Sequence, residues 1–187
     1  MMQLSSSQTT LATLAAREHA LCTYTASFTG TLESKMQQLE EAGVFAAYDE
    51  IYASYLTAYQ ATMEATEKLE ALKRLVFLSW YGLLEPSFIS GIGALSEAGI
   101  RTTYVWLDEH LRRQELDVEL HWMLSFYASW EYLLPPFSEP QLPALAAFIS
   151  GVDPTVGHVP THPWPWLAMD NRGQMGLYWQ SIQYKPF

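Results

Sequence analysis

Hydrophobic residues recur every three or four positions over most of residues 11–150, and this spacing is the period of an amphipathic helix. One stripe runs along residues 11–39, where Thr9 or Thr10 can cap the helix, and a second runs along residues 44–84. Gly43 lies between the two stripes, where a glycine can end a helix and allow a tight reversal. The pattern therefore predicts two long antiparallel helices.

Both stripes contain residues that do not fit an apolar face. Glu18, Thr25 and Lys35 are polar interruptions of the first stripe, and Lys73 lies on the second. Gly30 is a weak point in the first helix, because a glycine inside a helix costs about 1 kcal/mol against alanine. The first helix is therefore expected to weaken or kink at Gly30.

Capping residues and prolines divide the chain after the second stripe into shorter helices. Pro86 suits the first turn of a short helix, and Asp117 is a good N-cap for a later one. Pro135 and Pro136 are strong stops, because proline cannot continue a helix. The expected shorter helices, packed across the long pair, cover residues 87–96, 102–114, 118–134 and 140–150.

The composition changes after Gly151. Prolines recur between residues 154 and 165, so this part cannot be helix interior, and its tryptophans suit anchors on the helical body. Residues 173–187 fit either a short strand pair or one more helical turn. The sequence thus predicts an all-α fold, with a helical domain over residues 1–150 and an irregular Pro/Trp-rich tail over residues 151–187 that packs on the same domain.

The chain is acidic, with a formal net charge of −10 and a sequence pI of about 4.8. Such a charge argues against nucleic acid or an anionic membrane surface as a partner, because both repel an acidic protein. It is compatible with a basic protein partner. A hydrophobic content of 49% indicates a globular chain rather than a disordered one.

Three features of the sequence bear on the cellular compartment of the protein. Cys22 is the single cysteine, so no intrachain disulfide can form and no oxidising compartment is needed. The first residues lack the basic and apolar regions of a signal peptide. No apolar run reaches the roughly 18–20 residues that span a bilayer. We expect a soluble cytoplasmic protein.

Tyrosines gather on one face of the second predicted helix. Each brings a large ring and a hydroxyl group that needs a partner. The stripe is interpreted either as a helix–helix seam or as a stacking surface for an aromatic ligand. The candidate ligand-binding residues are Tyr52, Tyr55, Tyr59, Trp80, Tyr81, Trp122 and Trp130.

The motifs of common catalytic and metal sites are absent from the sequence. It contains no Glu-x-x-His pair, no His-Glu-x-x-His, no Gly-x-Ser-x-Gly and no Walker motif. His158 and His162 lie in the proline-rich segment without a matched third ligand. We therefore predict neither a metal nor a cofactor.

Glu85 is the first candidate for acid–base chemistry. The second predicted helix is apolar on all sides from Leu75 to Leu84, as is typical of a helix surrounded by other elements, and Glu85 follows directly. Burial there would raise the pKa of Glu85 and make it a candidate general acid or base. Alternatively, Glu85 caps the helix after Pro86 or pairs with an arginine.

Asp117 and His121 form the second candidate site. Their i,i+4 spacing places both side chains on one face of a helix, where the carboxylate could orient the imidazole or share a metal with it. Alternatively, Asp117 acts only as the N-cap and His121 lies at the rim.

Three functions are compatible with these patterns. The favoured one, because no catalytic constellation is evident, is a non-catalytic acidic interaction protein (an adaptor, inhibitor or immunity-type protein) that docks a basic protein partner. The first alternative is a helical bundle that binds a small molecule in a Tyr/Trp-lined pocket. The second is an acid–base enzyme that uses Glu85 and His121. A homodimer through the long helices fits all three.

Overall fold

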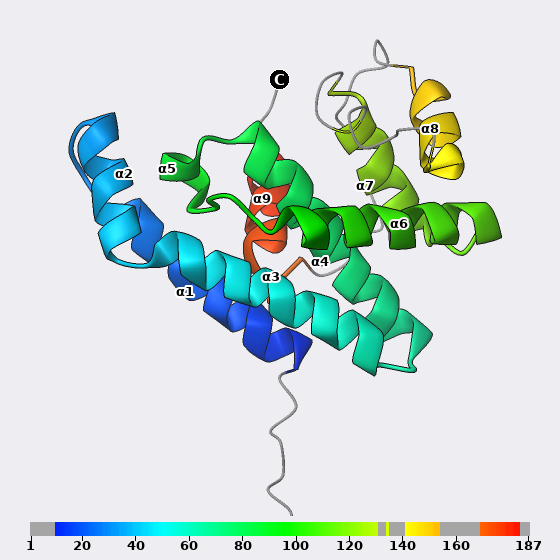
Figure 1. The fold of residues 1–187 in the computed structure, drawn as a ribbon, viewed down its shortest axis with the longest axis horizontal. Helices are drawn as coiled ribbons and strands as arrows, with labels where there is room; N and C mark the ends of the chain where they lie inside the picture. The colour runs from blue at the N-terminus through cyan, green and yellow to red at the C-terminus, as the bar shows by residue number, and fades with distance from the viewer. Residues whose placement is uncertain (1–9, 131–133, 135–140, 154–168, 184–187) are drawn as a thin grey trace, which may run out of the picture.

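Helices account for all regular structure in the part of the chain that the computed structural model describes, which is residues 10–130, 134, 141–153 and 169–183. This finding confirms the predicted all-α class (Figure 1). The nine helices in these residues are α1 (Leu11–Ser27), α2 (Leu32–Glu41), α3 (Val44–Ala61), α4 (Ala65–Leu84), α5 (Ser87–Ser90), α6 (Glu97–Arg113), α7 (Val118–Ala128), α8 (Pro143–Ser150) and α9 (Gly173–Gln183).

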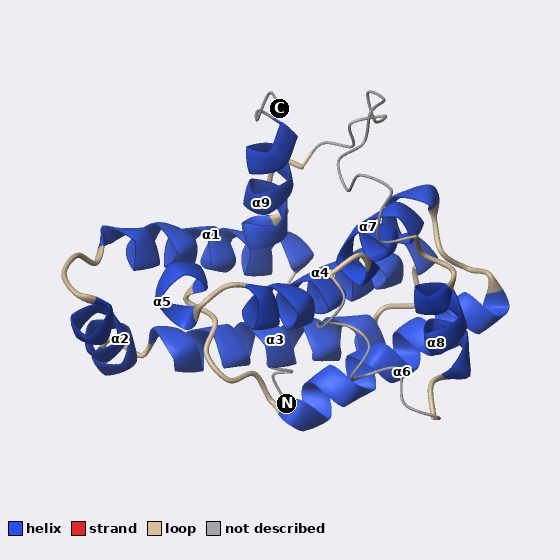
Figure 2. Cartoon of the chain, turned by 90° about the horizontal axis from the view of Figure 1, so that it is seen from above, coloured by secondary structure: helices blue, strands red, loops and turns tan. Residues whose placement is uncertain are grey.

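The helices pack around α4. α1 and α3 run side by side, α6 packs against α4 and carries α8, and α9 packs against α1 and α4 (Figure 2). Every residue from Ala71 to Trp80 is buried. The prediction that the apolar stretch from Leu75 to Leu84 is surrounded by other elements is therefore confirmed for residues 75–80. None of the helices in the described residues is long and apolar enough to cross a membrane.

Each of the two expected long helices is divided in two. Gly30 adopts a φ of 123°, and Thr31 then starts α2 by accepting a hydrogen bond from the Ser34 amide. The second stripe breaks at Thr62, whose extended backbone ends α3 and whose hydroxyl bonds the Glu67 carboxylate in the first turn of α4. The break at Gly30 follows from its φ, whereas apolar spacing continues across Thr62 and gave no sign of a break.

Three predicted helix boundaries are confirmed. The Thr10 side chain accepts a hydrogen bond from the Thr13 amide at the start of α1. Gly43 has a φ of 70° and separates α2 from α3. The Asp117 carboxylate accepts a hydrogen bond of 2.7 Å from the Leu120 amide at the start of α7.

The segment after α4 differs from the expected helix over 87–96. α5 ends at Ser90 because Gly91 takes a φ of 73°, and α6 begins at Glu97, earlier than expected. A Cβ atom on Gly93 would lie 2.8 Å from the Phe45 side chain. Close approach to α3 therefore excludes a larger side chain at this position.

The predicted irregular tail contains a helix. α9 occupies residues 173–183, so a helix rather than a strand pair forms there. α7 ends at Ala128, and α8 begins at Pro143. The expected stop at Pro135, the expected start at residue 140 and the histidines and tryptophans of 154–168 lie outside the described residues.

Candidate functional site: a charged cleft

A cleft of about 1150 Å³ opens between the end of α3, the first half of α4, the end of α6, the start of α7 and residues 170–172. Five of the chain's ten basic side chains line it, together with six acidic ones. We call it the charged cleft. Its charged residues are Lys68, Glu70, Lys73, Arg74, Glu109, Arg113, Glu115, Asp117, Glu119, Asp170 and Arg172.

The floor of the charged cleft is a set of buried ion pairs. Lys73 Nζ lies 2.5 Å from Asp117 Oδ2 and also contacts the Glu119 carboxylate. Arg172 Nη1 lies 2.5 Å from Glu119 Oε1, and the Arg172 guanidinium also binds Glu70, with Nε 2.9 Å from Oε1. These contacts join α4, α7 and the residues before α9.

Burial and hydrogen bonding have opposite effects on the pKa of Glu119 in the floor of the cleft. Glu119 is 4% exposed, and burial alone would raise the pKa of its carboxyl group. Hydrogen bonds from Arg172 and Lys73 outweigh burial and hold the pKa of Glu119 below its ordinary value. Glu119 is therefore a carboxylate at neutral pH.

A second set of polar contacts extends from the floor into the core. Arg74 Nη1 donates to Tyr55 Oη over 3.0 Å and to the Leu11 carbonyl over 2.9 Å, while Arg74 Nε donates to Glu70. Tyr55 Oη donates in turn to the Glu18 carboxyl group. Glu18 Oε2 accepts a hydrogen bond of 3.0 Å from the Gln174 amide at the start of α9.

Burial has its largest effect in this network on Tyr55 and Glu18, and Glu18 is the carboxyl group at its inner end. Glu18 is buried, with only 1% of its surface exposed. Burial raises the pKa of Glu18 from 4.5 to about 7, although the hydrogen bonds from Tyr55 and from the Gln174 amide act against burial. Glu18 is therefore close to half protonated near neutral pH.

Tyr59 and His110 lie at the rim of the cleft. The Tyr59 ring stacks on Trp106 with centroids 4.1 Å apart, and Tyr59 Oη lies 2.9 Å from His110 Nε2. Lys68 Nζ lies 4.9 Å from the centroid of the Tyr59 ring, and Glu115 Oε2 lies 3.4 Å from His110 Nδ1. Burial lowers the pKa of His110, which is therefore neutral at pH 7.

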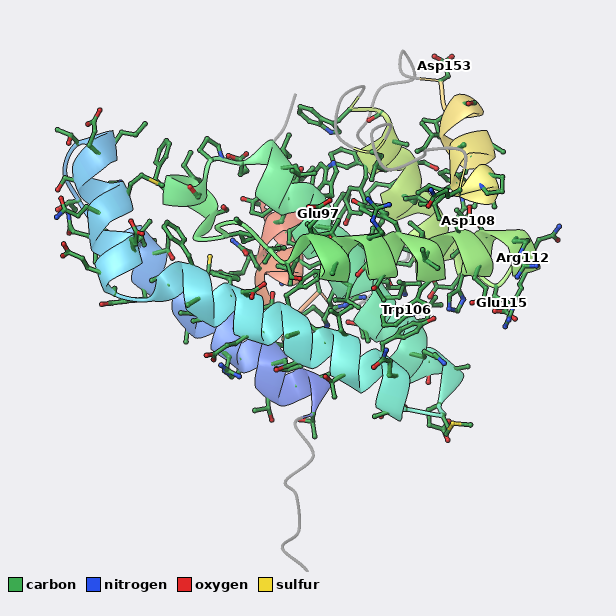
Figure 3. The ribbon with its side chains drawn as sticks, viewed as in Figure 1. Glu97, Trp106, Asp108, Arg112, Glu115 and Asp153 are labelled. Atoms are coloured by element: carbon green, nitrogen blue, oxygen red, sulfur yellow. The ribbon has the colours of Figure 1, made fainter. Side chains whose placement is uncertain are left out.

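The two sides of α6 have different roles. Trp106 and Glu115 lie on one side of α6, toward α4 (Figure 3). Asp108 lies on the opposite side, toward α8, where its Oδ1 accepts a hydrogen bond of 2.8 Å from the Leu145 amide (Figure 3). α6 thus presents one side to the cleft while the other fixes α8.

Some of the residues singled out from the sequence lie at this cleft. Tyr59 and Asp117 line it, and Tyr55 belongs to the network behind it. Tyr52 lies in the core, where its hydroxyl bonds the Ser79 and Thr103 hydroxyls over 2.7 Å each. The tyrosine stripe therefore forms a helix–helix seam at Tyr52 and Tyr55 and reaches the charged cleft at Tyr59.

The tryptophan candidates lie elsewhere. Trp80 is fully buried and stacks on Tyr127 with centroids 4.4 Å apart. Tyr81 stacks on Phe77, and the Trp122 ring lies 4.5 Å from that of Trp179 in α9. Trp130 is partly exposed beyond the end of α7. These rings pack α4, α7 and α9 together.

Glu85 and His121 are not brought into one site. Glu85 follows Lys73 by twelve residues, about 18 Å of helix rise, and it lines a different hollow. His121 is exposed on α7, where its ring lies edge-on to Phe148 with centroids 5.2 Å apart. Although Asp117 is one turn from His121, its carboxylate binds Lys73 and the Leu120 amide instead.

Much of the cleft was not apparent from the sequence. Glu18, in the network behind the cleft, did stand out, because it interrupts the first apolar stripe. Arg172 gave no local signal, since its partner Glu70 is 102 residues away in the chain. His110 on α6 was indistinguishable from other helical histidines until Tyr59 was found beside it.

No group of three or more His, Cys, Asp or Glu side chains within the described ranges is placed to hold a metal ion. Comparisons with protein-family models, with curated proteins and with solved structures find no match to this chain. The functional argument therefore rests on the geometry of the cleft.

Proposed function

We propose that this protein binds a small zwitterionic molecule, of the class of amino acids and short peptides, in the charged cleft. One observation carries the proposal. A chain with a net charge of −10 gathers five of its ten basic side chains in one cleft and interleaves them with six acidic ones. Such a lining offers hydrogen-bond donors and acceptors of both charge signs to one ligand.

The burial of the charges also favours a binding role. Lys73, Glu119 and Arg172 are all buried, and desolvation of an ion pair costs about as much as its attraction returns. Apolar residues would stabilise the same helix contacts at lower cost. Perturbed ionisable groups that line a cavity are therefore candidates for a functional site.

The rim provides separate places for the two ends of a zwitterion. Lys68 makes no ion pair with any residue that the structure describes, so its ammonium group is available to an anionic group of the ligand. The Asp117 side chain is 42% exposed and can accept a second cation beside Lys73. The Tyr59 ring, stacked on Trp106, holds the Lys68 ammonium group at the rim, with Nζ 4.9 Å from the ring centroid.

The test is a binding screen by isothermal titration calorimetry and thermal unfolding. The panel contains amino acids and dipeptides, each with its decarboxylated amine and its deaminated acid. We expect at least one zwitterion to bind and to stabilise the fold by about 2.7 kcal/mol at one hundred times its Kd. The singly charged analogues should bind at least tenfold more weakly.

A matched pair of variants locates the site. Lys68→Ala should weaken binding by about fivefold to tenfold, whereas Arg101→Ala should not change it. Arg101 is exposed on α6 and does not line the cleft. The proposal fails if no panel member binds saturably, or if a zwitterion binds Lys68→Ala and the unmodified protein equally well.

A further inference from the structure

A second hollow, of about 730 Å³, lies between the end of α2, the start of α3, the end of α4 and the start of α6. We call it the apolar groove. Most of its walls are aliphatic or aromatic side chains, among them Met36, Phe45, Leu83, Leu84, Ile92 and Leu95. It is separate from the charged cleft and shares no lining residue with it.

Two carboxylates, Glu40 and Glu85, are the only ionisable groups among the described residues that line the apolar groove. Neither carboxylate forms a hydrogen bond or an ion pair with any residue of the described ranges. In the charged cleft, by contrast, the buried carboxylates are paired with lysine or arginine. Within the part of the chain that the structure describes, no lysine or arginine therefore balances the negative charge of the groove.

Helix ends add to this charge. Glu85 is the C-cap of α4, and Glu40 lies in the last turn of α2. Neither helix has a basic residue in its last turn. The C-terminus of a helix carries a partial negative charge, which favours cations and disfavours carboxylates. Two helix ends and two glutamates thus make the groove a place where a cation is stabilised.

The apolar walls restrict what kind of cation fits. Leu83 is 47% exposed, and Glu85 lies on the wall beside it. A hydrated metal ion or a small ammonium ion would leave this apolar surface in water. A lysine or arginine side chain flanked by apolar residues covers the surface with its neighbours and its own methylene groups while its charged end meets the carboxylates.

We propose that the apolar groove docks a segment of a partner protein in which a lysine or arginine is flanked by apolar side chains. The basic group lies between Glu40 and Glu85, and the apolar neighbours cover Leu83 and Phe45. The inference gives a location to the basic protein partner that the acidic composition suggested. It does not depend on the ligand proposed for the charged cleft.

The first step of the test uses a random 12-residue peptide library displayed on phage, selected on the folded protein. A parallel selection uses the variant Leu83→Asp. Val105→Asp is the matched control, because Val105 and Leu83 are both 47% exposed and Val105 does not line the groove. We expect enriched peptides that bind the unmodified protein and Val105→Asp but not Leu83→Asp, and that contain Lys or Arg beside apolar residues.

The second step measures how much the two carboxylates contribute to the affinity for an enriched peptide, by fluorescence anisotropy. Glu40→Gln and Glu85→Gln should each raise Kd by about twofold to fivefold, the range of an exposed ion pair, and the double variant by about tenfold. Glu33→Gln, at an exposed position in the first turn of α2, should leave Kd unchanged. Added salt should weaken binding to the unmodified protein more than to the double variant.

Several results would overturn the proposal. Enriched peptides without basic residues would show an apolar site with no role for the carboxylates. An unchanged Kd in the double glutamine variant would do the same. A dimer in sedimentation equilibrium that Leu83→Asp abolishes would assign the groove to a second copy of the chain. Circular dichroism and thermal unfolding confirm that each variant is folded.

Discussion

Replacing Glu18 by glutamine should change how the stability of this protein depends on pH. Glu18 is buried between Tyr55 and the Gln174 amide, and burial raises the pKa of its carboxyl group from 4.5 to about 7. Glutamine has nearly the same shape and resembles the protonated acid. It therefore removes the titration. Its NH2 group cannot accept one of the two hydrogen bonds that the Glu18 oxygens receive, and this loss is the same at every pH.

The sign follows from the proton count of the two states. Below pH 4.5, Glu18 is protonated in both the folded and the unfolded chain, so its charge does not affect stability. Between pH 4.5 and about 7, the unfolded chain has released the proton while the folded chain still holds it, so the free energy of unfolding falls as pH rises. Above about pH 7 the loss is complete.

The magnitude follows from the same two values. The difference between a pKa of 4.5 and one of about 7 corresponds to about 3 kcal/mol. The difference in stability between the glutamine variant and the unmodified protein should shift in favour of the variant by about 3 kcal/mol from pH 4.5 to pH 8. Most of this shift should appear between pH 5 and 7.

Urea unfolding at pH 4.5, 5.5, 6.5, 7.5 and 8 measures this difference, because other titrating groups contribute equally to both proteins and cancel. Glu33→Gln, at an exposed position, serves as the control and should give a difference that is flat with pH. A flat difference for Glu18→Gln, or one in which the variant becomes less stable as pH rises, would refute the account of Glu18 as a desolvated carboxyl group.

Three further substitutions test the contacts around α9 and the charged cleft. Arg172→Ala should lower the free energy of unfolding by about 3 kcal/mol in urea, because it leaves a buried carboxylate without one of its two cations, whereas Arg101→Ala should change it by less than about 0.5 kcal/mol. Gly173→Ala should lower the free energy of unfolding by about 2 kcal/mol and lower the melting temperature. Gly173 has a φ of 61°, and a Cβ there would lie 2.5 Å from Glu18 Oε2. An unchanged melting temperature would show that α9 can shift at no cost. Asp117→Asn keeps a capping oxygen and should be about 1 kcal/mol more stable than Asp117→Ala, and equal stabilities would show that the ion pair with Lys73, not the cap, is what Asp117 provides.

The helical class and several boundaries could be predicted because they depend on neighbours in the sequence. Thr10, Gly43 and Asp117 act through groups within three residues, and their roles were evident. The division at Thr62 was not, because an apolar stripe that continues across a short break looks like one helix. Apolar spacing records which face is buried but not whether the backbone remains helical.

The charged cleft could not be predicted, because its contacts join distant parts of the chain. Arg172 and Glu70 are 102 residues apart, and Lys73 and Glu119 are 46 apart. Glu18 is a carboxyl group whose pKa burial raises, and the sequence marked it only as a polar interruption of an apolar stripe. The packing of α1 against α3 and α9, rather than the residues beside Glu18 in the sequence, excludes water from it.

The hydrogen bond between Glu18 and the Gln174 amide also orders events in time. The two residues are 156 positions apart, and a ribosome adds about 5–20 residues per second. α1 is therefore made roughly 8–30 seconds before the residues that start α9. During that interval Glu18 has neither α9 to face nor the hydrogen bond from the Gln174 amide, so its burial is incomplete. The desolvated, half-protonated group exists only after the last described helix has docked, which makes the protonation of Glu18 a late step of folding.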